Sequence, residues 1–435
     1  MIPRARSDPA GRLTAAASIA SLAEDAIPLY PLYAVMFGDR DVAGAGLSPA
    51  AISSLFILWS VCSFVFEIPT GILADRVPRR PLLVIGPLVT AAGFALWTWW
   101  PSYAAFAAGF VLWSAGSALR SGTMEALVYD TLAAHGLALR YAQVAGRMRA
   151  MSALGVLLGT MLAVPLAAWG GYHAAGAASV VACIICAGAS WMLPEHAPPG
   201  RADGADADPR VSDDTDNNDT DNNDTTDSRI SRSTMIRRLC RDGVLRRLFV
   251  LVIALTWVEA LDEYLPLLAE AMWGGASTAE AVALLMVVVA VGDIGGGFAA
   301  ERTGARRPSP RRLAPWLLAG AVALAAGAAS GHPAGIVLVA FAFGVFGWSS
   351  VMAEALMQDR VPSRVRATVT SVVGVGEEVV AVMAFGSWAL GSQWLPPTML
   401  FALAAIPYVA LGVALVFVPG ATTTRASARC PNSSE

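Results

Sequence analysis

Residues 67–80 read EIPTGILADRVPRR, and residues 296–307 read GGFAAERTGARR. Each stretch follows an apolar run and carries a glycine, then an acidic residue, then arginines at the same spacing. The matched residues are Gly71, Asp75, Arg76 and Arg80 in the first stretch and Gly297, Glu301, Arg302 and Arg306 in the second. A pattern repeated over such a distance indicates a chain built from two related halves.

The composition indicates a protein with many membrane spans. Hydrophobic residues make up 56% of the 435 residues and charged residues only 14%, which excludes an ordinary soluble domain. A helix needs about 20 apolar residues to cross a bilayer, and twelve runs of that kind can be counted. They cover residues 13–37, 48–72, 81–100, 103–124, 147–169, 172–194, 249–272, 279–300, 313–330, 334–357, 367–390 and 397–418. The predicted fold class is an all-α polytopic membrane protein with two homologous six-helix bundles.

Arginine positions predict the orientation of these spans, because short cytoplasmic loops concentrate basic residues. Alternate loops are rich in arginine, whereas the other loops contain only Arg40. The sequence therefore predicts a multi-pass protein of the inner (plasma) membrane, in contact with its lipids, with both termini in the cytoplasm.

Four regions follow from the span count. We predict an N-terminal bundle over 1–196, a central cytoplasmic loop over 197–246, a C-terminal bundle over 247–419 and a cytoplasmic tail over 420–435. The central loop contains DDTDNNDTDNNDTTDS, an acidic repeat with no apolar side chain to bury, so disorder is expected there. An acidic docking segment is the alternative interpretation.

The repeat recurs at two further places, so chance is a poor explanation. Glu24, Asp25 and Pro28 in the first span match Asp262, Glu263 and Pro266 in the seventh. Glu125 and Asp130 after the fourth span match Glu354 and Asp359 after the tenth. Spans n and n+6 thus correspond throughout.

With these residues in view, the sequence resembles the major facilitator superfamily of bacterial twelve-span transporters. The segment 67–80 is similar to the signature loop of that family, between spans 2 and 3. The resemblance implies a gate in which Asp75 lies at the start of span 11 and Arg76, Arg79 and Arg80 meet Glu125 or Asp130. In span 5 the spacing of Gly146, Gly155 and Gly159 is similar to the start of the family's antiporter motif, which implies export.

Ionisable residues inside the spans are the candidate site residues, because such groups are costly in a bilayer and usually face a wet cavity or one another. The seven acids placed near mid-depth are Glu24, Asp25, Glu259, Asp262, Glu263, Glu377 and Glu378. Arg120, in the inner third of span 4, is the base that we expect inside the membrane. Helical spacing puts Asp25, and equivalently Glu259 and Glu263, on a cavity-facing stripe, with Glu24 and Asp262 about 100° away. Glu377 and Glu378 are adjacent, so at most one is expected to point fully inward.

These features predict a proton-coupled antiporter that exports a cationic or neutral apolar small molecule, working as a monomer. Buried carboxyl groups can carry protons, and a surplus of acid disfavours anions. A proton-coupled importer, or a non-transporting membrane sensor on the same fold, is the alternative. No nucleotide or Ser-His-Asp motif is present. Cys183 and Cys186 have the spacing of a redox or metal motif, but they lie in an apolar run where we interpret them as small packing residues. We therefore expect no enzyme activity, no cofactor or metal and no nucleic-acid partner.

Overall fold

The computed structural model describes residues 9–194, 243–274, 278–304, 310–361 and 366–416, and these residues form helices joined by short turns. The N-terminal half consists of α1 (Pro9–Asp25), α2 (Tyr33–Gly38), α3 (Pro49–Arg76), α4 (Arg79–Trp99), α5 (Tyr103–Arg120), α6 (Thr123–Ala134), η1 (Ala138–Arg140) and α7 (Tyr141–Trp191). The C-terminal half consists of α9 (Gly243–Leu255), α10 (Trp257–Asp262), α11 (Leu265–Trp273), α12 (Ala279–Gly304), α13 (Pro310–Ala329), η2 (Pro333–Gly335), α14 (Ile336–Gln358), α15 (Arg366–Gly391), α16 (Pro397–Leu403) and α17 (Ile406–Val416). Most of the predicted central loop and the predicted tail lie outside the described residues.

Each of the twelve predicted spans corresponds to helical structure. Within the described part of the chain, eight helical stretches are long and apolar enough to cross a membrane. One of them contains spans 5 and 6, because α7 runs through a kink at Gly170 and Gly171 where the backbone leaves helical geometry. Gly171 has a φ of 56°, a conformation that glycine adopts without a steric penalty. Spans 1 and 7 are divided into shorter helices.

The break in span 1 follows from its prolines. Pro28 and Pro31 have no N–H to donate and cannot continue a helix, so the chain leaves helical geometry between Asp25 and Tyr33. The amide of Leu29, freed by the break, donates to the hydroxyl of Ser179 on α7 at 3.0 Å. A partner of this kind is needed because an unpaired backbone group costs several kcal/mol in an apolar environment.

A short helix occupies the region where the sequence suggested only a loop between spans 4 and 5. Gly122, with a φ of 68°, turns the chain out of α5 and into α6. Val128 and Leu132 on α6 are buried in a core cluster with α1 and α7. The helix therefore extends the N-terminal bundle on the side of the basic loops.

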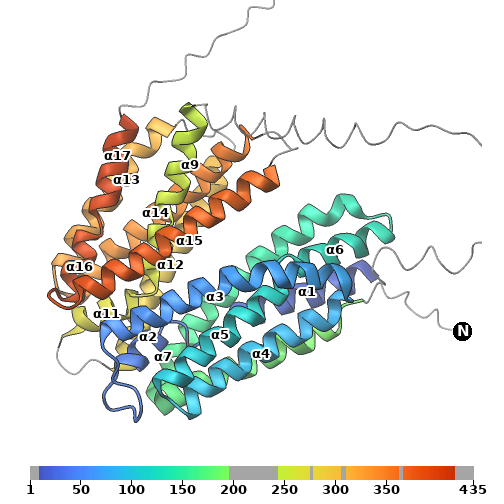
Figure 1. Cartoon of the computed structure of the whole chain (residues 1–435), viewed down its shortest axis with the longest axis horizontal. Helices are drawn as coiled ribbons and strands as arrows, with labels where there is room; N and C mark the ends of the chain where they lie inside the picture. The colour runs from blue at the N-terminus through green and yellow to red at the C-terminus, as the bar shows by residue number, and fades with distance from the viewer. Residues whose placement is uncertain (1–8, 195–242, 275–277, 305–309, 362–365, 417–435) are drawn as a thin grey trace, which may run out of the picture.

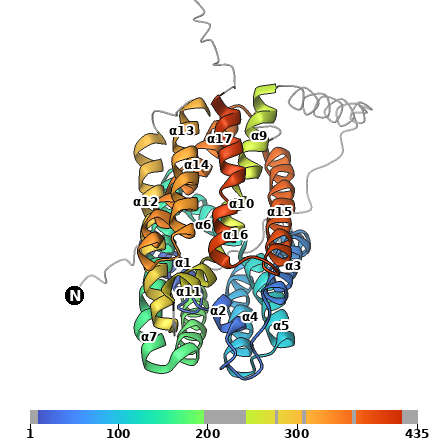
Figure 2. The same cartoon turned by 90° about the vertical axis from the view of Figure 1, so that its left-hand side faces the viewer.

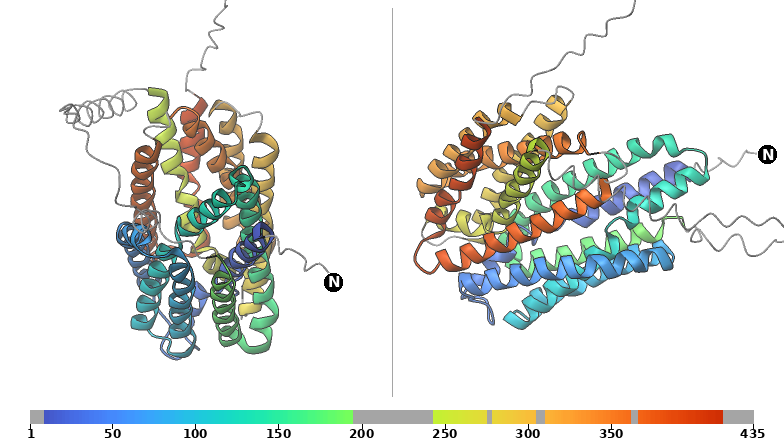
Figure 3. Two further views of the ribbon diagram at one scale, coloured as in Figure 1. Left: turned by 90° about the vertical axis from the view of Figure 1, so that its right-hand side faces the viewer. Right: turned by 45° about the horizontal axis from the view of Figure 1, so that its top comes forward.

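The two halves form separate bundles that meet along one end (Figure 1). Viewed from the left-hand side, most of the helices from α9 onward lie above α2, α4, α5 and α7 of the N-terminal half (Figure 2). Figure 3 shows the two halves from other directions. The halves are joined near α2 and α11, where Ser53 and Tyr264 share a hydroxyl hydrogen bond of 2.7 Å. Phe56 packs against Tyr264 and Phe385 with ring centroids 5.2 and 5.6 Å apart. Toward the basic loops the halves diverge, so the protein is closed at one end and open at the other.

Candidate functional site

A cavity of about 1720 Å³ lies between the halves, on the open side of the Phe56–Tyr264 contact. Its polar lining is strongly acidic. The acids that line it are Glu67 from the N-terminal half and Glu259, Asp262, Glu263, Asp293, Glu377 and Glu378 from the C-terminal half. No arginine, lysine or histidine belongs to this lining set, and no ion pair between described residues involves any of the seven acids.

Three cavity acids come from the broken seventh span. Glu259 and Asp262 lie on α10, and Glu263 follows directly at its end. The helical spacing predicted that Asp262 faces away from the cavity, and this prediction is wrong because Asp262 is one of the lining residues. Asp262 lies three residues after Glu259 on α10, so the two side chains are about 60° apart around the helix axis. A cavity of this width is therefore lined by both residues.

Span 11 contributes two adjacent acids, Glu377 and Glu378. Both line the cavity; that at most one of them points fully inward stays a prediction. The carboxylate of Glu378 accepts a hydrogen bond from the hydroxyl of Ser60 on α3. This contact joins the two halves inside the cavity.

Two acids of the cavity were missed in the sequence. Asp293 lies in the middle of the eighth predicted span, and Glu67 lies near the end of the second. The same rule that selected the other acids, an ionisable group inside an apolar run, would have found both.

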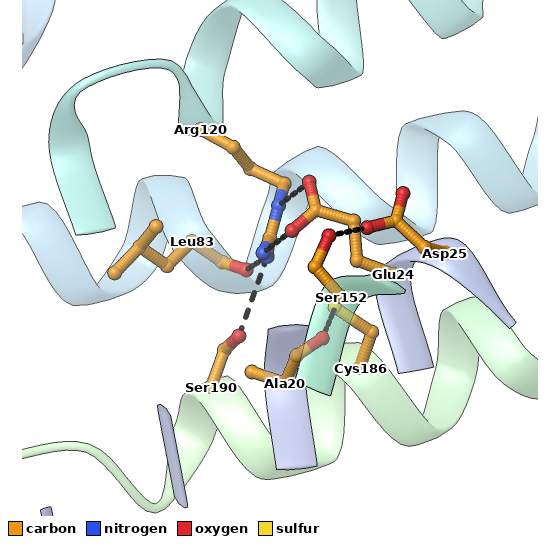
Figure 4. Close-up of polar contacts among 8 residues, drawn as sticks. All are labelled: Ala20, Glu24, Asp25, Leu83, Arg120, Ser152, Cys186 and Ser190. Atoms are coloured by element: carbon orange, nitrogen blue, oxygen red, sulfur yellow. Dashed lines mark hydrogen bonds and ion pairs between the residues drawn. The ribbon is translucent and has the colours of Figure 1, made fainter. Parts of the chain in front are cut away.

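A second polar cluster lies within the N-terminal half (Figure 4). Arg120, at the end of α5, is 6% exposed and makes a two-pronged ion pair with Glu24, in which Nε donates to Oε1 at 2.7 Å and Nη2 to Oε2. Arg120 also donates to the carbonyl of Leu83 at 3.3 Å and lies 3.5 Å from the hydroxyl of Ser190. Arg120 is thus paired with one of the predicted intramembrane acids.

Asp25 lies next to this ion pair but has a different partner. The hydroxyl of Ser152 on α7 donates to its carboxylate, as Figure 4 shows. Asp25 does not belong to the lining of the large cavity, whereas its predicted counterpart Glu263 does. The two residues nevertheless share one feature, since each lies where a helix ends at a break in its span.

On the side of the basic loops, the structure joins two residues of the predicted gate. Arg79, at the start of α4, makes an ion pair with Asp130 on α6. The guanidinium of Arg80 lies over the ring of Trp191, 4.4 Å from its centroid. The side chain of Asp75 and residues 362–365, which precede α15, lie outside the described part of the structure.

The remaining gate residues are spread over the same side. Arg76 ends α3, and Gly297, Glu301 and Arg302 lie in the last turns of α12; all four are exposed. Glu125, also exposed, borders a pocket of about 290 Å³ that includes Glu24 and Arg120. The surroundings of Gly71 lie outside the described part of the structure.

Comparison with known proteins agrees with this architecture. Residues 13–385 match the sequence profile of the Major Facilitator Superfamily. The chain belongs to the Major Facilitator Superfamily. The protein is therefore a multi-pass membrane protein of a transporter family rather than a member of an enzyme family. A comparison with curated protein sequences found no match.

Solved structures of other members of the Major Facilitator Superfamily share the fold at low sequence identity. The nucleoside transporter NupG is 12% identical with a TM-score of 0.67, and the match covers 94% of this chain and 98% of that one. A D-xylose-proton symporter is 14% identical with a TM-score of 0.69, covering 94% and 96%. A peptide transporter of the POT type, in complex with sulfate, is 16% identical with a TM-score of 0.65, covering 95% of each chain.

Proposed function

We propose that the protein is a proton-coupled antiporter that exports a cationic, partly apolar small molecule by alternating access. The observation that supports this proposal is the acid-rich cavity, which is lined by no base among the described residues. Carboxylates gathered in one cavity repel one another when ionised, and protons or a bound cation relieve this repulsion.

Exchange follows from competition for the same groups. A cation that binds among Glu259, Asp262 and Glu263 is favoured when these acids are ionised, and protons that bind there neutralise the attraction. Proton binding then lowers the affinity for the cation, and cation binding lowers the affinity for protons by the same factor. An anionic substrate would need arginine or lysine in the cavity.

The spacing of Gly146, Gly155 and Gly159 in span 5 supports export. Gly155 and Gly159 lie against the backbone of α1 and of the break that follows it, so close that a Cβ atom at either position would overlap Leu22 or Ile27. Span 5 therefore packs tightly against the point where span 1 is interrupted. Two of the three glycines, Gly155 and Gly159, therefore allow span 5 to pack closely against span 1.

The test is flux in proteoliposomes with an imposed pH gradient, across a panel of lipophilic cations, amines and neutral compounds. Glu263→Gln should abolish proton-driven flux at normal membrane levels while leaving downhill exchange of a neutral compound measurable. Asp25→Asn shows whether the neighbouring cluster in the N-terminal half also carries a proton. Glu270→Gln is the matched control, because Glu270 lies on the same span but outside the cavity lining.

The opposite outcomes separate the alternatives. Addition of substrate to inverted vesicles should release protons from the interior if the protein is an antiporter. A pH change of the opposite sign would identify a proton-coupled importer. Ligand binding without any flux would identify a membrane sensor.

A further inference from the structure

The wall of the cavity that faces most of the acids is aromatic. Among the described residues, seven aromatic side chains line the cavity, and the N-terminal half contributes five of them: Tyr30, Tyr33, Trp59, Phe64 and Trp113. Six of the seven acids belong to the other half. The cavity therefore has an aromatic side and an acidic side.

Three of these rings form a continuous stack. Trp113 of α5 lies between Tyr30, with ring centroids 5.2 Å apart and planes at 15°, and Trp59 of α3, at 5.1 Å and 25°. The stack draws on three different spans, so it is a feature of the assembled bundle. Its rings are only partly buried, whereas Trp97 and Phe110, in the aromatic core behind it, are 0% exposed.

An unused polar group lies beside the stack. Tyr33 lines the cavity, is 4% exposed, and meets Trp113 edge to face at 6.3 Å. Its hydroxyl has no hydrogen-bond partner among the described residues. Buried hydroxyl groups are nearly always paired, so this one points to a ligand or water that occupies the cavity beside Trp113.

From this arrangement we infer that the Tyr30–Trp113–Trp59 stack is a binding platform for a flat aromatic ring, and that the substrate is a planar aromatic cation with a hydrogen-bonding substituent directed at Tyr33. Rings of this kind attract one another in offset stacks, and an indole face attracts a delocalised positive charge. The acids on the C-terminal half complement the charge from the opposite side. The inference deepens the proposed function and rests on it for the positive charge.

The test measures, by calorimetry, how tightly the purified full-length protein binds each of two monovalent cations. N-methylacridinium is planar and aromatic, and tetrabutylammonium has no ring. The wild-type protein should bind N-methylacridinium more tightly. Trp113→Leu should weaken that binding about tenfold and leave tetrabutylammonium within about twofold. Trp113→Phe should retain most of the preference, because a ring is still present.

Two further measurements guard against a general loss of structure. Trp169→Leu removes an indole that is 85% exposed and outside the cavity, and it should change neither affinity. In the wild-type protein an amino-substituted N-methylacridinium should bind more tightly than the unsubstituted ion. Tyr33→Phe should remove this difference in affinity without changing the affinity for the unsubstituted ion.

Each result is decisive. The platform is refuted if Trp113→Leu weakens both cations equally or weakens neither. A wild-type protein that binds both cations equally well refutes the platform but not cation transport. If the wild-type protein binds neither cation, both the platform and cation transport are refuted. A clear preference for the aromatic cation without pH-driven flux keeps the platform and refutes the proposed proton coupling.

Discussion

Replacement of Glu24 by glutamine tests the role of the ion pair in the N-terminal half. Glu24→Gln removes the negative charge opposite Arg120, which is 6% exposed. The amide oxygen of glutamine can still accept one hydrogen bond, in addition to the contacts of Arg120 at 3.3 and 3.5 Å. Removing one partner of a fully buried pair costs about 3–5 kcal/mol. The side chain of Glu24 is 40% exposed, so solvent screening reduces the expected cost to about 2–3 kcal/mol.

The measurement is equilibrium unfolding of the purified protein in mixed micelles, followed by circular dichroism. Asp25→Asn is the neighbouring control, and it should cost about 1 kcal/mol or less, because it alters a single hydrogen bond with Ser152. A double variant with leucine at positions 24 and 120 should recover stability relative to Glu24→Gln, because no charge remains buried. The reasoning is refuted if Glu24→Gln and Asp25→Asn have equal stabilities.

Three other predictions concern the gate, the central loop and the packing of span 5. Arg79→Ala and Asp130→Asn each break the same ion pair, so each should increase cysteine accessibility on the side of the basic loops, and the double variant should add nothing further. Deletion of 213–227 should leave flux within about twofold, since the segment has no apolar side chain to bury, and a larger loss at normal membrane levels would show a specific role. Gly155→Ala should lower the free energy of unfolding by about 1–3 kcal/mol through overlap with α1. Gly146→Ala, at a position with no atom within 4 Å of the new Cβ, should not.

The sequence predicted the spans well because apolar length is a local property. The predicted run 279–300 corresponds to α12, and 397–418 corresponds to α16 and α17, with ends within a few residues. The repeat between 67–80 and 296–307 predicted the family correctly for the same reason. Local patterns of this kind do not depend on knowing which helices are neighbours.

The partners of the intramembrane acids could not be predicted in this way. Glu24 and Arg120 are 96 residues apart, and no local pattern shows that α1 and α5 bring them together. Asp262 was misplaced because its rotation relative to Glu263 was considered, whereas residues three apart on a helix, such as Glu259 and Asp262, lie on the same face. The aromatic wall went unnoticed because Trp59 and Trp113 are ordinary residues in apolar spans, and only their assembly shows the stack.

The concentration of six cavity acids on one half of the molecule has an electrical consequence. In the proposed cycle the halves rock against each other, so ionised carboxylates such as Glu259 and Glu263 move with the C-terminal half through the membrane field. One elementary charge crossing the whole field changes the free energy by about 2.3 kcal/mol per 100 mV. Reorientation of the deprotonated, unloaded carrier should therefore respond to voltage, whereas reorientation with the carboxylates neutralised should not. A voltage step applied to the protein in a planar bilayer would then produce a transient current that disappears when protons or the substrate saturate the cavity.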